Sequence, residues 1–297
     1  MKTQIPEQLK ADVPQTTWGK ILTATPVIMT VVATMLAGLA SSEMTRAQYD
    51  RSLAAQQQSK AGDQWNFFQA KRLRASLQRS TLDTVEAVAA VHPLDLAALS
   101  GVDRVPGAKA ALQTGELPPL PAAPAVETNL QAALTALEGE RSESEIMPLL
   151  LKVRPETLET ALRAARDRAL AYDAVITPIS RAIDQIEAAL AGNGSVEQRR
   201  DFAAARLRYA AARYDAEARL NQAIASLYEL QVRQGNHSAE RHHKRSQRFF
   251  FGMLAAQAAV IISTFSLAAR QRSMLWSLAA GAGLAAIAFA IYVYLYV

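Results

Sequence analysis

One short run, residues 63–72, contains many of the aromatic, amide and charged side chains that could bind a partner. On a helix, Trp65, Phe68 and Arg72 share one face, and Phe67 and Lys71 share another. This spacing predicts an aromatic anchor with cation–π pairs between Phe68 and Arg72 or between Phe67 and Lys71. The simpler interpretation is packing against a neighbouring helix, and the alternative is a docking surface for another chain. The residues assigned to packing or docking are Asp63, Gln64, Trp65, Phe67, Phe68, Gln69, Lys71 and Arg72.

A basic cluster precedes the second of three long apolar stretches. Its members are His237, Arg241, His242, His243, Lys244, Arg245 and Arg248. The simplest interpretation is a solvated segment beside a membrane. The functional alternative is contact with anionic lipid headgroups, which we assign to Arg241, Lys244, Arg245 and Arg248. Adjacent His242 and His243 do not share a helix face, so the cluster predicts no metal site.

Several kinds of chemistry have no candidate residues. The chain has 297 residues and no cysteine, which excludes disulfides, thiolate catalysis and cysteine-ligated metals. We find no phosphate-binding loop, no dinucleotide fingerprint and no catalytic triad, and the net charge of +5 comes without a module that reads nucleic acid. We therefore expect a protein that is not an enzyme, with no cofactor and no nucleic-acid partner, and we identify no small-molecule substrate.

Three apolar stretches, at residues 21–40, 249–269 and 274–297, determine how the polar residues are positioned. Each approaches or exceeds the ~20 apolar residues that cross ~30 Å of hydrocarbon. They predict a membrane protein in which a polar lead at residues 1–20 precedes the first span and the last two spans form a hairpin around Arg270 and Arg272. Apart from that turn the spans contain no charged residue or histidine, which argues against a transporter.

Residues 41–248 are expected to form a helical extramembrane domain. From Glu43 to about Ala90 there is no proline and one glycine, so the first span should continue as one helix. Apolar residues spaced alternately by three and four predict an antiparallel coiled-coil hairpin of residues 155–190 and 196–232, whose second helix continues into the second span. The fold class is therefore all-α, with three transmembrane helices and a long antiparallel coiled-coil or helical-bundle stalk.

The part between the first long helix and this hairpin is expected to be irregular. Residues 117–124 contain four prolines and predict an extended, semi-rigid linker. Short helices are expected at residues 126–138 and 143–153. Because the first and last stalk helices both reach the membrane, this region must lead part of the way back towards it.

The distribution of basic residues predicts which side of the membrane the stalk occupies. The two sides carry nearly equal numbers of lysines and arginines, but short loops and the first helix weigh most. The short turn at Arg270 and Arg272 and the lysines of the lead should therefore stay cytoplasmic. We expect a bacterial inner membrane protein with a cytoplasmic N-terminus and a periplasmic stalk.

The run Asp63-Gln64-Trp65, followed by Gln69-Ala70-Lys71 just after an N-terminal span, resembles the bacterial membrane family known as domain of unknown function 4337. A C-terminal pair of spans with a short basic loop before Trp276 is similar too. The resemblance covers about residues 20–80 and 200–297, and the proline-rich region departs from it. It implies a membrane protein with a helical extramembrane domain and no assigned activity.

Alanine-rich heptad seams bury best against other helices. We therefore expect a structural or interaction protein that binds membrane lipids and either forms homo-oligomers through its stalk or serves as an accessory subunit of a membrane assembly. The first alternative is a receptor-like protein in which the stalk senses a signal. The second is an oligomeric channel whose spans line a pore.

Overall fold

The computed structural model describes residues 17–95, 105, 107–268 and 272–296, and every regular element in these ranges is an α-helix. The seven helices of the described ranges are α1 (Thr17–Val88), α2 (Ala108–Gln113), α3 (Thr128–Glu138), α4 (Glu143–Leu150), α5 (Pro155–Asn193), α6 (Val196–Ala268) and α7 (Arg272–Tyr296). The all-α prediction is confirmed, and the expected helix bounds agree with the observed ones to within a few residues. The short helix α2 was not predicted, because six residues are too few to show a helical period.

Two of the helices are exceptionally long, as the sequence predicts. α1 has 72 residues and α6 has 73, so each continues from an apolar segment into a polar one without a break. Pro26 lies inside α1. Thr25 and Thr30 donate hydrogen bonds to backbone oxygens four residues earlier, as expected for hydroxyl side chains in an apolar helix.

The described residues cluster into two compact units, and the boundary falls inside both long helices. One unit, the span unit, comprises residues up to Leu53 together with Gly235–Val297. The other, the stalk unit, comprises Ala54–Gln234. Residues 41–53 and 235–248, which we assigned to the extramembrane domain, therefore cluster with the spans.

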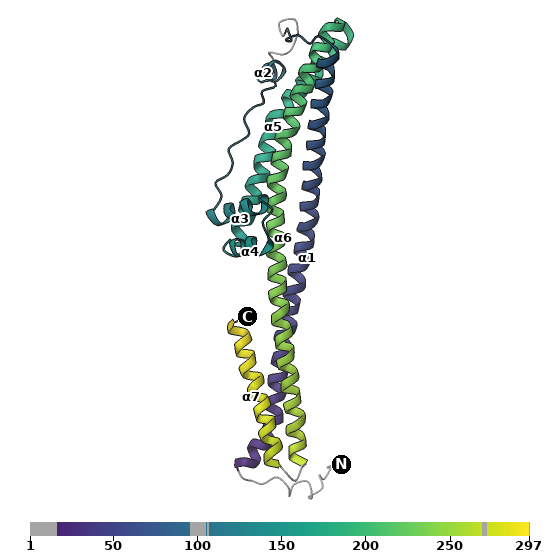
Figure 1. The fold of residues 1–297 in the computed structure, drawn as a ribbon. Helices are drawn as coiled ribbons and strands as arrows, with labels where there is room; N and C mark the ends of the chain where they lie inside the picture. Colours follow the sequence, from purple (N-terminus) through teal and green to yellow (C-terminus); the bar gives the residue numbers. More distant parts are fainter. Residues whose placement is uncertain (1–16, 96–104, 106, 269–271, 297) are drawn as a thin grey trace. The chain divides into compact units, whose positions relative to one another are not determined.

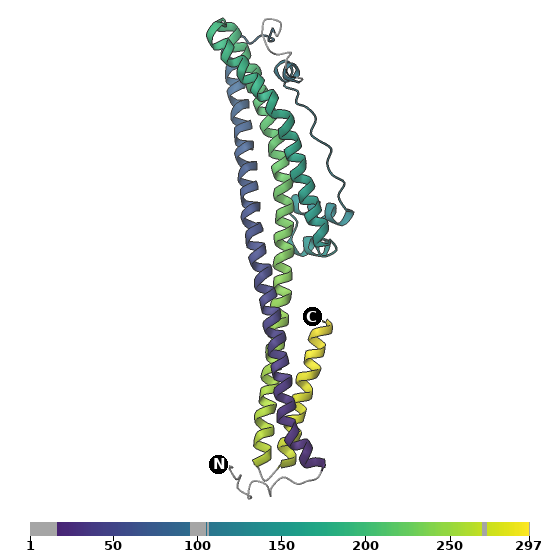
Figure 2. The same cartoon turned by 180° about the vertical axis from the view of Figure 1, so that it is seen from behind.

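In the stalk unit, α1, α5 and α6 lie side by side along their lengths (Figures 1 and 2). The predicted seam of α5 is buried, with Ile176 and Ile179 at its centre, and it packs against Phe202 and Tyr209 of α6. The turn between the two helices has a capping box. The Ser195 backbone N–H donates to Gln198 Oε1 at 3.0 Å, and the Gln198 N–H donates to Ser195 Oγ at 3.1 Å.

From α2 to α4 the chain runs along the outside of α5, towards the start of that helix (Figure 1). α2 lies near the α5–α6 turn, and α3 and α4 lie near the start of α5 (Figure 1). The linker between α2 and α3 has no regular structure, and Leu117 and Leu120 pack on the core around Ile179. Arg168 Nε donates to the Pro121 carbonyl at 2.7 Å, which fixes the extended linker to α5.

In the span unit, three helices contain a segment that is long and apolar enough to cross a membrane: α1, α6 and α7. Small residues bring them together, since Ala256 of α6 and Ala286 of α7 share one core with Leu36 of α1. Trp276 Nε1 donates to Thr25 Oγ1 at 3.0 Å and so joins α7 to α1. Most of the predicted turn at residues 270–272 lies outside the described residues.

Candidate functional site

The aromatic run lies in the part of α1 that belongs to the stalk unit, and its two faces differ. Trp65 and Phe68 are half-buried and meet edge to face, with ring centroids 5.5 Å apart. The Trp65 side chain also hydrogen-bonds Glu229 of α6, and burial raises the pKa of that carboxyl. Phe67 is exposed on the other face. Gln64 is half-buried as well, whereas Asp63 and Gln69 are exposed.

The two cations of this run pair with carboxylates of α6. Lys71 Nζ lies 2.8 Å from Glu217 Oε2, and Arg72 Nη1 lies 3.5 Å from Asp215 Oδ1. Arg79 pairs with the same Asp215. Among the described residues, the predicted cation–π pairs of Lys71 and Arg72 are not formed, because a nearby carboxylate attracts a cation more strongly than a ring face does.

Glu217 of α6 pairs with Lys71 of α1 and is linked to α5 through Arg213. Arg213 Nε donates to Glu217 Oε1 at 2.7 Å, and Arg213 Nη1 donates to Ser180 Oγ of α5 at 3.0 Å. Burial would raise the pKa of Glu217, but hydrogen bonds and charge attraction from Lys71 and Arg213 outweigh it and lower the pKa. Burial also raises the pKa of nearby Tyr172 to about 12. The Glu217 carboxylate is therefore ionised and the Tyr172 hydroxyl is neutral at neutral pH.

The outward face of α1 carries a second group of apolar side chains that sequence inspection missed. Phe67, Leu73 and Leu77 are 54%, 72% and 59% exposed, and Ala70 between them is exposed too. Spacings of three, six and ten residues place all four within about a third of the helix circumference. We name these four residues the α1 patch. The sequence signal was present, but Leu73 and Leu77 do not fit a heptad seam.

A polar cluster lies just beyond the apolar segment of the span unit. His242 Nδ1 lies 2.6 Å from Glu43 Oε2, and the Glu43 side chain is only 12% exposed. His242 Nε2 lies 4.0 Å from Asp50 Oδ2, and Ser238 donates to that same oxygen at 2.7 Å. Ser246 donates to the Ala40 carbonyl at 2.7 Å. His242, which we grouped with a solvated basic cluster, is therefore turned inward between two carboxylates.

The other basic residues of that cluster face different environments. Arg241 and Lys244 are exposed, and Lys244 Nζ lies 3.4 Å from Glu240 Oε1. Arg245 and Arg248 are half-buried. Within the ranges that the structure describes, no three or more histidine, aspartate or glutamate side chains are arranged to hold a metal ion.

The contact face of α1 follows a seven-residue alanine repeat that also escaped sequence inspection. The buried alanines of this repeat are Ala33, Ala40, Ala47, Ala54, Ala61 and Ala75. Phe68 interrupts the repeat, and three residues after several of the alanines stands a polar residue, such as Glu43, Asp50 or Gln64. A buried helix face is usually recognised by its large apolar residues. A face made of alanine and polar residues is therefore hard to detect from the sequence.

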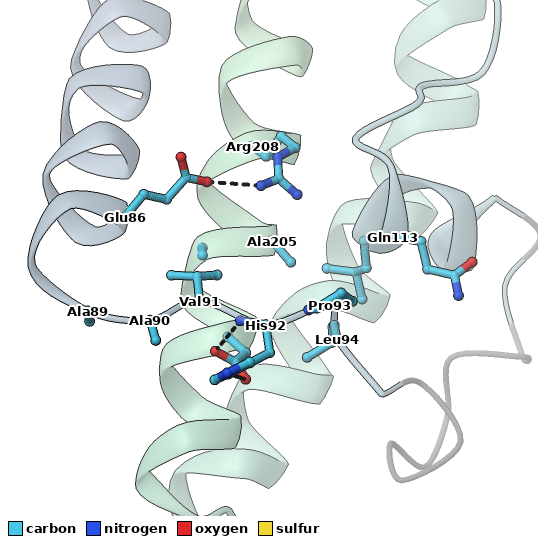
Figure 3. Close-up of a pocket in the computed structure, with 13 residues that line it drawn as sticks. Glu86, Ala89, Ala90, Val91, His92, Pro93, Leu94, Gln113, Ala205 and Arg208 are labelled. Atoms are coloured by element: carbon cyan, nitrogen blue, oxygen red, sulfur yellow. Dashed lines mark hydrogen bonds and ion pairs between the residues drawn. The ribbon is translucent and has the colours of Figure 1, made fainter.

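One cavity of the stalk unit opens where α1 ends (Figure 3). Its volume is about 460 Å³, and the end of α1, the segment after it, α2 and α6 line it. Glu86 pairs with Arg208 at 3.1 Å, and the His92 backbone N–H donates to Asp201 Oδ1 at 3.2 Å. The volume of the cavity would suit a small molecule, but the polar groups named here are already paired with one another.

The fold and these contacts define an all-α, membrane-associated protein whose polar helices are joined by alanine seams and ion pairs. Residues 18–102 match the family model described as Domain of unknown function (DUF4337). The match contains the first span and the aromatic run, which confirms the resemblance predicted there. Neither the curated proteins nor the solved structures that were searched gave a match.

Proposed function

We propose that this chain is a membrane-anchored structural or interaction protein, without catalytic activity, that associates through its extramembrane helices. The partner is a second copy of the chain or another subunit of a membrane assembly. The observation that carries this proposal is the α1 patch, in which three large apolar side chains and Ala70 are exposed on the stalk part of α1. Exposed apolar groups of this kind, with Arg74 beside them, are typical of interaction surfaces.

The structure changes where association should occur. The heptad seams of α5 and α6 pack against each other inside the stalk unit, so they are occupied by the chain itself. The α1 patch, by contrast, remains exposed. Its spacing matches the way in which a helix presents anchor residues to a partner helix or groove.

Replacing Leu73 and Leu77 by glutamate should abolish this association. Each leucine that is buried at an interface contributes ~1.5–3 kcal/mol, so the double variant should bind at least ~100-fold more weakly. The measurement is the mass of the full-length chain in mild detergent, together with the proteins that co-purify from native membranes. The matched control replaces exposed Leu170 and Val175 of α5 by glutamate. A wild-type particle that is one chain with no co-purifying subunit would contradict the proposal, and so would equal association of the two variants.

We further propose a bacterial inner membrane location, with the N-terminus in the cytoplasm and the stalk unit in the periplasm. The basic turn between the last two spans and the lysines of the lead support this orientation. Because the chain has no cysteine, Ser80→Cys creates a single labelling site on an exposed position of α1. A membrane-impermeant maleimide should label this variant in intact spheroplasts. Labelling only after lysis would reverse the orientation.

A further inference from the structure

An apolar groove lies between α1 and α6 in the span unit, where the apolar segment gives way to polar residues. It has a volume of about 570 Å³, which is within the range of ligand sites. Apolar side chains line most of it: Ala37, Ala40, Met44, Phe250, Phe251 and Met253. Phe250 and Phe251 are both exposed, so the groove is open on the side towards the surroundings of the span unit.

The lining becomes polar at one end of the groove. His243 and Gln247 lie there, with the Gln247 Nε2 3.0 Å from the His243 Nε2. The Ser246 hydroxyl also lines the groove, but it already donates to the Ala40 carbonyl. His243 and Gln247 therefore supply the polar groups that a bound molecule would meet beside an otherwise apolar surface.

Beyond this polar end, two cations that do not themselves line the groove share one carboxylate. Glu240 lies 3.9 Å from Arg51 of α1 and 3.4 Å from Lys244 of α6, measured between the charged atoms. Lys244, Gln247 and Phe251 are spaced by three and four residues and so follow one face of α6. Arg51 follows Met44 by seven residues and continues the α1 side of the groove. The end of the groove therefore carries a net positive charge.

We propose that this groove binds one membrane phospholipid with an anionic headgroup. An acyl chain lies along Ala37, Phe250 and Met253, and the headgroup oxygens accept hydrogen bonds from Gln247 and Lys244. An amphiphile matches a groove that is apolar at one end and cationic at the other, whereas a soluble polar ligand would leave the aromatic lining unmatched. The proposal is independent of the α1 patch, which belongs to the other unit.

The experiment is native mass spectrometry of the full-length chain released from nanodiscs that contain equal amounts of phosphatidylglycerol and phosphatidylcholine. Wild type should retain one phosphatidylglycerol per chain. Ala37→Trp fills the groove and should remove the bound lipid, whereas Leu39→Trp places the same side chain on an exposed position outside it. Lys244→Gln should weaken retention by about fivefold, the usual effect of one basic residue near an anionic surface.

Arg248→Gln is the charge-matched control. Neither side chain lines the groove, but around the axis of α6 Arg248 is turned farther than Lys244 from His243 and Gln247, which do. Equal retention of the two lipids by wild type would overturn the proposal. Equal losses in Lys244→Gln and Arg248→Gln would also overturn it, because they would show diffuse attraction to an anionic surface. If Ala37→Trp does not fold, which its helical circular dichroism reports, the comparison of the two charge variants still decides the question.

Discussion

Replacing His242 by alanine is expected to destabilise the span unit by about 2–3 kcal/mol. The substitution removes the closest partner of Glu43, whose side chain is only 12% exposed, and it leaves that carboxylate in a poorly solvated position. Breaking a fully buried ion pair costs ~3–5 kcal/mol. The cost is lower here, because the imidazole carries a charge only when it is protonated, because His242 is 20% exposed, and because Arg46 lies 3.6 Å from Glu43 as a second partner.

The measurement is the thermal midpoint of the full-length chain in detergent, which falls by roughly 2–4 °C per kcal/mol for a chain of this size. His237→Ala is the control, since His237 is exposed on the same helix. The double variant Glu43→Gln with His242→Ala should recover part of the loss, because it removes the unpaired charge. Equal midpoints for His242→Ala and His237→Ala would show that the pair does not stabilise the unit.

Replacing Glu217 by glutamine is expected to destabilise the stalk unit by about 2 kcal/mol at neutral pH. The change removes two charge-assisted hydrogen bonds and leaves Lys71 and Arg213, both less than one-third exposed, facing each other without a counter-charge. Glu187→Gln is the matched control. Glu187 also accepts a hydrogen bond from an arginine, Arg206, but both side chains of that pair are more than 40% exposed.

The effect of Glu217 should depend on pH in a defined direction. Its pKa is lower in the folded chain than the ordinary value of 4.5, so the stability that it contributes is fully present above pH 4.5. This stability is lost as the pH falls through the lower folded pKa. The difference in thermal midpoint between wild type and Glu217→Gln should therefore shrink below pH 4.5. Burial raises the pKa of Glu229, which acts in the opposite direction, but that effect is common to both proteins and cancels in the difference.

Local physical rules were enough to predict the helices and the segments that could cross a membrane. Proline and glycine mark helix ends, capping residues such as Ser195 fix a turn within a few positions, and a seam such as that around Ile179 has a period that needs no knowledge of its partner. Long apolar runs identify possible spans by length alone. Each of these signals depends on residues that are close together in the chain.

Such rules could not predict which residue each polar side chain contacts. Whether Lys71 meets an aromatic ring on its own helix or Glu217 on another depends on the register of two helices that are far apart in sequence. Whether His242 faces water or Glu43 depends on the register as well. The alanine repeat of α1 leaves that register open over residues 33–61, because a shift of seven residues places alanine on alanine again there.

The sequence by itself therefore determined that this protein is all-α, which segments are apolar enough to cross a membrane, and where every described helix except the short α2 begins and ends, to within a few residues. The tertiary structure decided which polar groups lie opposite each other, which apolar side chains of α1 stay exposed, and where a groove opens between α1 and α6. The physical reason is the distance along the sequence over which each kind of interaction acts. Helix formation depends on neighbours within a few residues, whereas ion pairs, exposed patches and grooves exist only after distant helices have taken one register.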